Sequence, residues 1–171
     1  MDFYKFCIDK KEIKTMKAYL SGAMEFAEKE GADWRKKMTL WLKANLNHSS
    51  FDPVVNSAKL IKNERAQEYR RWKISNSNRY SNFIRKCINQ DIHIVKNEID
   101  YLICLWDKNV LKGAGTHAEV TISFDNNKPV YLVNKLSKKD LSGWIMACST
   151  EIFKDFDSLK LFLLKKYNSN A

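Results

Sequence analysis

Short apolar runs alternate along this chain with longer amphipathic stretches. The runs have the length and composition of β-strands, and turn signals such as Ser21-Gly22 and Asp52-Pro53 end two of them. The unbroken run YLICLWD is typical of a central parallel strand that is covered on both faces. The predicted strands are residues 17–20, the start of 49–55 (SSFDPVV), 101–107 and 128–133.

The stretches between these strands predict helices. With Asp33 as the expected N-cap, the apolar side chains Trp34, Met38, Trp41 and Leu42 follow at positions i, i+4, i+7 and i+8. This spacing places them on one face of a helix. We therefore expect the stripe to pack against a sheet rather than bind a ligand.

Two further helices are predicted towards the C-terminus, a short one in DLSGWIMACST and a longer one in DSLKLFLLKKY. Since parallel strands need crossover connections, the alternation predicts an α/β fold with a single doubly wound, mostly parallel sheet. Helices should cover both faces, as in flavodoxin-like and Rossmann-like proteins. At 171 residues the chain should form one domain over 1–171, with its core at about 17–167.

Composition and charge narrow the class of protein. No apolar stretch reaches the roughly 18–20 residues that span a bilayer, so we expect a cytoplasmic protein without a membrane segment. The formal net charge of +10 favours anionic partners such as nucleic acid or nucleotide phosphates. The cysteines are too far apart for a zinc site or a disulfide framework, and we expect buried free thiols at Cys7, Cys87, Cys104 and Cys148.

Residues 56–90 hold much of the positive charge, with nine Lys and Arg side chains against only Glu64 and Glu68. Aromatic rings are interleaved with these cations. The combination suits a nucleic acid, because cations neutralise phosphates and rings stack on bases. The alternative, which we favour, is a basic helical insertion whose charges are solvated and whose rings touch the core. The rings are Tyr69, Trp72, Tyr80 and Phe83.

A carboxylate interrupts the apolar line of the helix predicted in YSNFIRKCINQDIHIVKNEID. Ile84, Ile88, Asp91 and Val95 share one face at helical spacing. Burying an unpaired aspartate is unfavourable. Asp91 therefore marks either a satisfied structural hydrogen bond or the opening of a pocket.

The stretch KGAGTHAEV follows the predicted strand 101–107, whose last residue, Asp107, should lie where open α/β sheets bind ligands. Thr116-x-x-Glu119 matches a capping box, in which the glutamate bonds back to the N–H of the cap. The glycines at 113 and 115 would then give the turn its backbone freedom. The alternative is that Glu119 faces a pocket as a catalytic carboxylate.

The order and spacing of these segments resemble the nucleoside 2-deoxyribosyltransferase-like family. The resemblance runs from AYLSGAM through DIHIVKNEIDYLICLWD, GAGTHAEV and NKPVYLV to LSGWI, or about Lys17 to Cys148. It implies an α/β enzyme of small subunits that cleaves the N-glycosidic bond of deoxynucleosides or their monophosphates. This chemistry needs no metal and no organic cofactor.

The resemblance also implies a role for each catalytic residue. Glu119 corresponds to the nucleophile, which attacks the anomeric carbon as the base leaves and forms a covalent glycosyl intermediate. Water then gives hydrolysis, and another base gives transfer. Asp91 corresponds to a second acid with a raised pKa that assists the leaving base, and Tyr19 to a tyrosine near the sugar and the nucleophile.

The remaining predicted contacts concern the substrate. Several transferases have an aspartate where this chain has Gly113, so sugar recognition must differ, with Asp107 as a candidate substitute. Ser142 in LSGWI replaces an Asn that reaches a neighbouring subunit's sugar; in related 2′-deoxynucleoside 5′-phosphate N-hydrolases a serine contacts the 5′-phosphate. Serine also suits a helix N-cap there. The predicted substrate-binding residues are Ser21, Gly22 and Ala23, whose N–H groups would cradle an anion, with Asp107, Gly113, Gly115, Thr116 and Ser142.

The resemblance further implies a homodimer or a larger homo-oligomer, since family members complete their sites across subunits. Three other functions fit the same residues. The pocket could bind a nucleotide without cleaving it, as a sensor or partner module. A hydrolase that cleaves NAD is a neighbouring alternative, and residues 59–86 suit a nucleic-acid-binding protein.

Overall fold

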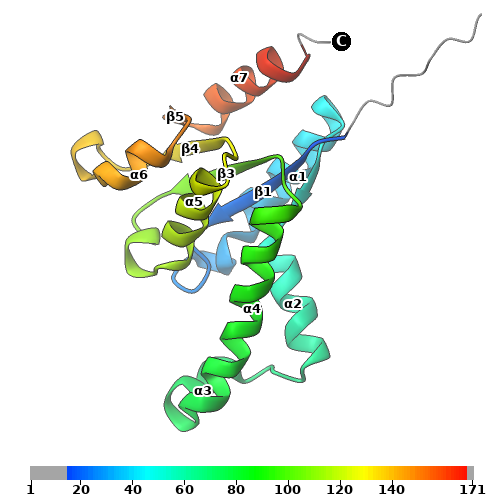
Figure 1. Ribbon diagram of the computed structural model, residues 1–171, viewed down its shortest axis with the longest axis vertical. Helices are drawn as coiled ribbons and strands as arrows, with labels where there is room; N and C mark the ends of the chain where they lie inside the picture. Colours follow the sequence, from blue (N-terminus) through cyan, green and yellow to red (C-terminus); the bar gives the residue numbers. More distant parts are fainter. Residues whose placement is uncertain (1–14, 169–171) are drawn as a thin grey trace, which may run out of the picture.

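The computed structural model describes residues 15–168, and its centre is a five-stranded parallel sheet (Figure 1). The strands lie in the order β2-β1-β3-β4-β5, which confirms the predicted α/β fold with one doubly wound sheet. After β1 the chain adds β2 on one side of it, and then crosses to the other side and adds β3, β4 and β5 in turn. The strand order therefore reverses between β1 and β3, the point at which such sheets bind ligands. The strands are β1 (Lys17–Gly22), β2 (Ser49–Phe51), β3 (Tyr101–Trp106), β4 (Val130–Asn134) and β5 (Glu151–Phe153).

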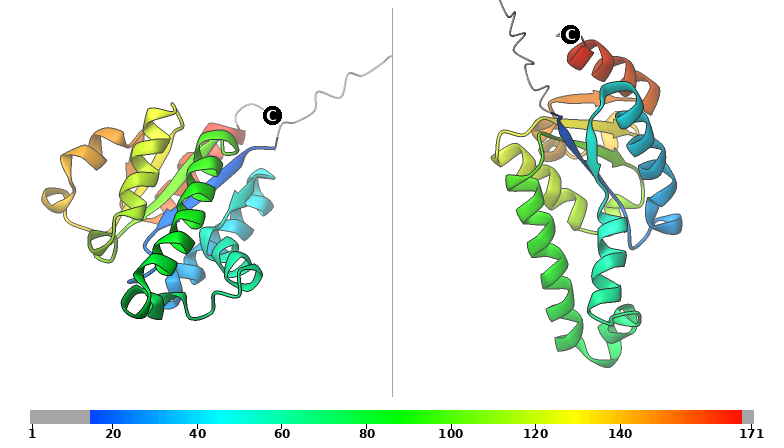
Figure 2. Two further views of the ribbon diagram at one scale, coloured as in Figure 1. Left: turned by 60° about the horizontal axis from the view of Figure 1, so that its bottom comes forward. Right: turned by 90° about the vertical axis from the view of Figure 1, so that its right-hand side faces the viewer.

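Helices cover both faces of the sheet, with α1 and α7 on one face and α4 and α5 on the other (Figure 2). Short 3₁₀ turns at 28–31, 110–112 and 138–140 complete the connections. Within residues 15–168 no helix is both long and apolar enough to cross a membrane. The helices are α1 (Ala32–Leu46), α2 (Pro53–Asn63), α3 (Tyr69–Ser75), α4 (Ser77–Asn97), α5 (Gly115–Asp125), α6 (Gly143–Cys148) and α7 (Phe156–Asn168).

Two apolar layers sandwich the sheet, because successive side chains of a strand point to opposite faces. In β1, Tyr19 joins the layer beneath α4 and α5, while Leu20 joins the layer beneath α1 and α7. From α1, Met38 and Leu42 are buried in this second layer. The predicted helical stripe thus packs on the sheet.

Several predicted boundaries differ from the structure by one or two residues, among them those of α1 and β1. Helix α1 begins after Gly31, whose φ of 70° suits glycine, so the prediction that Asp33 is the N-cap was wrong. Asp33 lies in the first turn and pairs with Lys29 at 3.2 Å. Strand β1 continues to Gly22 rather than ending at Leu20, since its last two residues are still paired with β3.

The basic segment is helical, as expected, and projects away from the sheet as the α2–α3–α4 unit (Figures 1 and 2). Its rings pack on one another: Phe83 is buried, with its centroid 4.9 Å from that of Tyr69 and 6.3 Å from that of Trp72. The Arg79 guanidinium stacks on Trp72 at 3.7 Å. These rings therefore form a small core for the insertion itself.

The described cysteines are free thiols. Cys104 and Cys148 are buried as predicted, whereas Cys87 is only half-buried. Cys7 lies outside the described residues.

Candidate active site

A cavity of about 220 Å³ opens at the carboxyl ends of β1 and β3, where the strand order reverses. Its walls come from the loop after β1, the segment after β3, and one carboxyl side chain each from α4 and α5. Those two side chains are Asp91 and Glu119. The fold thus brings into one cavity two carboxyl groups that are far apart in the sequence.

Glu119 points towards β1 rather than back along its own helix. It accepts one hydrogen bond from the Tyr19 hydroxyl at 2.9 Å and another from the hydroxyl of Ser21. Helix α5 begins at Gly115 with Ala114 at the N-cap position, and no side chain caps it. The capping-box interpretation of Thr116 was therefore wrong, because Thr116 already lies inside the helix and the Glu119 carboxylate has other partners.

The surroundings of Glu119 act on its charge in opposite directions. Burial raises the pKa of the carboxyl above its ordinary value, while the hydrogen bonds from Ser21 and Tyr19 and the positive charge of Arg35 lower it. Burial is the larger effect, so the pKa is raised overall, and the donors that point at the carboxylate oxygens offset part of the cost of burying the charge. Both donors come from β1, an interior strand that pairs with β2 and β3.

Arg35 supplies a fully buried positive charge behind this cavity. Its guanidinium donates to the carbonyl oxygens of Leu20 (3.0 Å), Gly22 (2.8 Å) and Glu30 (2.7 Å). A Cβ added at Gly22 would lie 3.1 Å from the Trp34 ring, so glycine allows α1 to approach β1 closely. Arg35 was not identified from the sequence. Its spacing from Met38 and Leu42 placed it on the buried face of α1.

Asp91 is partly buried in the wall of the same cavity. Burial, and next the negative charge of Glu119, raise the pKa of Asp91 to about 7, although the neighbouring Tyr19 hydroxyl opposes this. The carboxyl can thus hold a proton near neutral pH. One residue of the predicted apolar face of α4 differs from the prediction, because Ile88 is 47% exposed.

Tyr19 lies beside both carboxyl groups and is fully buried. Burial, followed by the negative charge of Glu119 and then that of Asp91, raises the pKa of its phenol well above the ordinary value. The hydroxyl therefore stays protonated and acts as a donor to Glu119.

The predicted substrate-binding residues separate into two groups. Gly22, Ala23, Gly113, Gly115 and Thr116 line the cavity, and Ser21 reaches it through Glu119. The other two residues do not line it. Asp107 accepts hydrogen bonds from the backbone N–H (2.8 Å) and side-chain amide (3.3 Å) of Asn109, and exposed Ser142 lies at the N-cap position of α6 without a side-chain cap bond.

The glycines of the KGAGTHAEV stretch leave space rather than provide unusual backbone angles. Neither Gly113 nor Gly115 has a positive φ, so the expectation that they give the turn special freedom was wrong. A Cβ at Gly115 would meet nothing within 4 Å. The first N–H groups of α5 begin at this open position, and a helix N-terminus attracts anions.

Several residues of the cavity were not identified from the sequence. They follow the ends of β1 and β3, so their place next to a strand end was the available signal. They are Met24, Glu25, Phe26, Asn109, Val110 and Ala114. The half-buried ring of His117 packs against Trp106, with the ring centroids 4.7 Å apart, and does not line the cavity.

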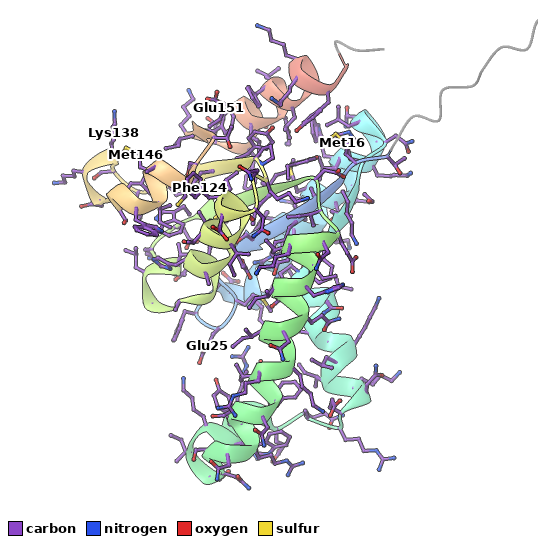
Figure 3. All side chains as sticks on the ribbon, in the orientation of Figure 1. Met16, Glu25, Phe124, Lys138, Met146 and Glu151 are labelled. Atoms are coloured by element: carbon purple, nitrogen blue, oxygen red, sulfur yellow. The ribbon has the colours of Figure 1, made fainter. Side chains whose placement is uncertain are left out.

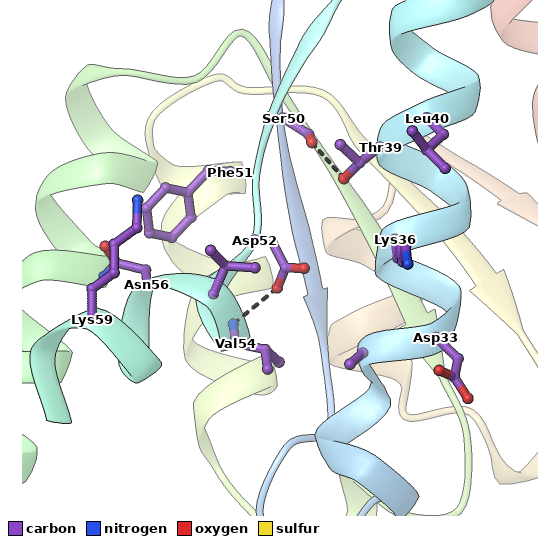
Figure 4. Close-up of a pocket in the computed structure, with 12 residues that line it drawn as sticks. Asp33, Lys36, Thr39, Leu40, Ser50, Phe51, Asp52, Val54, Asn56 and Lys59 are labelled. Carbon is purple, nitrogen blue, oxygen red and sulfur yellow. Dashed lines mark hydrogen bonds between the residues drawn. The ribbon is translucent and has the colours of Figure 1, made fainter. Parts of the chain in front are cut away.

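A larger cavity of about 460 Å³ lies beside the edge strand β2, between α1 and α2 (Figure 4). The carboxylate of Asp52, which lines this cavity, caps α2 by accepting a hydrogen bond from the Val54 N–H at 2.9 Å. Ser50 and Thr39 are hydrogen-bonded to each other at 2.7 Å (Figure 4). Asp52, Ser50 and Thr39 therefore already have hydrogen-bond partners within the protein.

The sequence matches no protein-family model, and no curated protein matches it. Among solved structures, the chain is similar to the CMP N-glycosidase BcmB from Clostridium botulinum. The two chains share 15% sequence identity, and the similarity covers 86% of this chain and 97% of that chain with a TM-score of 0.49. No residue role in this chain follows from a similarity of this level.

Proposed function

We propose that this protein is an N-glycosidase that cleaves the bond between base and sugar in a deoxynucleoside 5′-monophosphate. The observation that carries the proposal is the pair of carboxyl groups in one cavity. Glu119 is held by two donors, whereas Asp91 has a pKa raised to about 7. Two carboxyls with unlike surroundings are what glycoside cleavage requires, one as a nucleophile and one as an acid.

The reaction proceeds in two steps. In the first, a Glu119 oxygen forms a bond to the anomeric carbon while the bond from that carbon to the base nitrogen breaks. The electron pair of the broken bond goes to the base, and Asp91 gives its proton to the base. In the second, water attacks the anomeric carbon, releases Glu119 and returns a proton to Asp91.

The other residues prepare this reaction. The hydroxyls of Tyr19 and Ser21 fix the orientation of the nucleophile, and Arg35 favours its ionised form from behind β1. Since the Glu119 charge also raises the pKa of Asp91, the ionised nucleophile helps to keep the acid protonated. All of these groups lie on regular strands and helices, which holds their geometry.

A nucleotide is proposed over a nucleoside because the cavity borders groups that attract an anion. The N-terminus of α5 lies on one side, next to Gly115, and the loop after β1 with Ala23 lies on the other. The formal net charge of +10 also raises the local concentration of anions.

The test is incubation of the protein with deoxynucleosides, their 5′-monophosphates and NAD, followed by chromatography for free base. We expect free base from one or more monophosphates and slower release from the matching nucleosides. Binding of a nucleotide without base release on long incubation would instead indicate a sensor. Nicotinamide release from NAD alone would replace the proposed substrate class.

A further inference from the structure

A second cavity, of about 150 Å³, lies next to the candidate active site. The two cavities share three wall residues, Met24, Glu25 and Asp91. Glu25 lies on the loop after β1, alongside α4 (Figure 3). Each cavity is smaller than the roughly 300–1,000 Å³ usual for a small-molecule site, but joined they fall within that range. The substrate therefore has room for two parts, one on each side of Asp91.

Aromatic and apolar side chains form one part of the wall of the second cavity. They come from the helical insertion, with Tyr69 on α3 and Tyr80, Phe83 and Ile84 on α4. Phe83 is buried, whereas the two tyrosines are half-buried and keep part of their surface accessible. Such walls suit a flat ring, because aromatic faces stack on rings of any base.

The charges around this cavity are largely neutralised. Arg70, which lines it, is paired with Glu30, and Lys73 pairs with Glu25 at 3.2 Å. Both ion pairs join α3 to the segment after β1. A phosphate would have to compete with these carboxylates, whereas a neutral ring would not. The anion-attracting groups lie instead by the first cavity, at the N-terminus of α5.

We propose that the second cavity holds the leaving base, with its ring against Tyr69 and Tyr80, while the sugar and its 5′-phosphate occupy the first. Asp91, at the junction, then faces the base nitrogen that receives its proton. This inference rests on the proposed N-glycosidase function. It gives the α2–α3–α4 insertion a role in substrate specificity, because its residues would determine which base fits the second cavity.

Cys87 offers a direct report on occupancy, because it lines the second cavity one helical turn before Asp91. Cys104 and Cys148 are buried. In a Cys7→Ser variant, the accessible thiol among the described residues would therefore be that of Cys87. Burial raises the pKa of this thiol, so alkylation is best followed at mildly alkaline pH. We expect free nucleobases to slow alkylation and deoxyribose 5-phosphate to leave it unchanged. Equal protection by both, or protection by the sugar phosphate alone, would overturn the assignment.

Substitution of Tyr80 by alanine tests the same assignment through turnover. We expect the KM for a nucleotide to rise about tenfold through lost stacking, with no change in inhibition by deoxyribose 5-phosphate. The matched control is Ile74→Ala on α3, since Ile74 is 92% exposed and outside both cavities. An unchanged KM in Tyr80→Ala, or weakening of both ligands together, would contradict a base subsite.

The two proposals fail in distinguishable ways. If the wild-type protein releases no base from any nucleotide, the N-glycosidase proposal fails, and the inference that depends on it fails as well. If the wild type releases base but Cys87 is not protected by nucleobases, only the base subsite is overturned.

Discussion

At the scale of single residues, the site depends on the different surroundings of two carboxyl groups. Glu119 receives hydrogen bonds from two hydroxyls, whereas burial and the nearby Glu119 charge raise the pKa of Asp91 to about 7. Burial raises the pKa of both carboxyls, and at Glu119 the hydrogen bonds from Ser21 and Tyr19 and the charge of Arg35 oppose this rise. The same functional group is thereby given two chemical roles.

This difference predicts the pH dependence of base release. Asp91 must carry a proton to donate it, so kcat/KM should fall as the pH rises through about 7. Asp91→Asn removes the proton donor and should lower the rate about 100-fold while removing that alkaline decrease. The control is Asp125→Asn, at an exposed position near the end of α5, which should keep the wild-type profile. An Asp91→Asn variant with the wild-type pH profile would exclude Asp91 as the acid.

The sequence could predict these residues only where their position is unusual. Asp91 interrupts an apolar helical face, and Glu119 follows a strand and a glycine-containing turn. Both could therefore be identified as candidate functional residues. Local pattern alone misassigned the Glu119 interaction, because the partners that settle it, Tyr19 and Ser21, lie about 100 residues away. Asp107 shows the converse case. It lies at the end of a strand as expected, but it bonds to Asn109 two residues later.

At the scale of secondary-structure elements, Arg35 joins α1 to β1. Its three hydrogen bonds satisfy the carbonyls of Leu20, Gly22 and Glu30, and Asp52 lies 3.9 Å from its Nε atom. A sequence pattern does not identify such a residue, because arginine on a helix is usually solvated. The alternation of apolar runs did predict the strands themselves, since it reflects burial on both faces of the sheet.

Substitution of Arg35 by leucine should therefore destabilise the protein by about 3 kcal/mol or more, because buried carbonyls and the Asp52 carboxylate lose their partner. The free energy of unfolding from denaturant titration measures this effect. Lys37→Leu, an exposed position on the same helix, should change that energy by no more than about 0.5 kcal/mol. Similar stabilities for the two variants would show that Arg35 does not hold α1 against β1.

At the scale of the whole molecule, one exposed apolar area lies over α5 and α6. Phe124 (Figure 3) is 56% exposed and Trp144 is 66% exposed. The Trp144 indole on α6 donates a hydrogen bond to the Thr121 hydroxyl on α5 at 3.0 Å. Ser142 lies two residues before Trp144 and outside the cavity of its own chain. If Ser142 contacts a phosphate, that phosphate belongs to the site of another subunit. The single-domain organisation over 1–171 and the homo-oligomer both remain predictions.

We predict that Trp144→Ser weakens self-association, because it removes the largest exposed apolar side chain of this area. Sedimentation velocity over a range of concentrations measures the change. Leu161→Ser on α7, where Leu161 is 70% exposed, is the control and should associate like the wild type. A wild-type protein that stays monomeric at all concentrations would contradict both the oligomer and the role of Ser142.

The central claim is that Glu119 attacks the sugar, and the most direct measurement is base release by Glu119→Gln. Glutamine has nearly the same shape; its amide oxygen can accept from one of the two hydroxyls of Tyr19 and Ser21, and its amide nitrogen can donate to the other. The fold should therefore be retained, as thermal unfolding would show. We predict that base release from a deoxynucleotide falls at least about 1,000-fold in this variant and stays unchanged in Glu28→Gln, at an exposed position. Turnover by Glu119→Gln at the wild-type rate would contradict it.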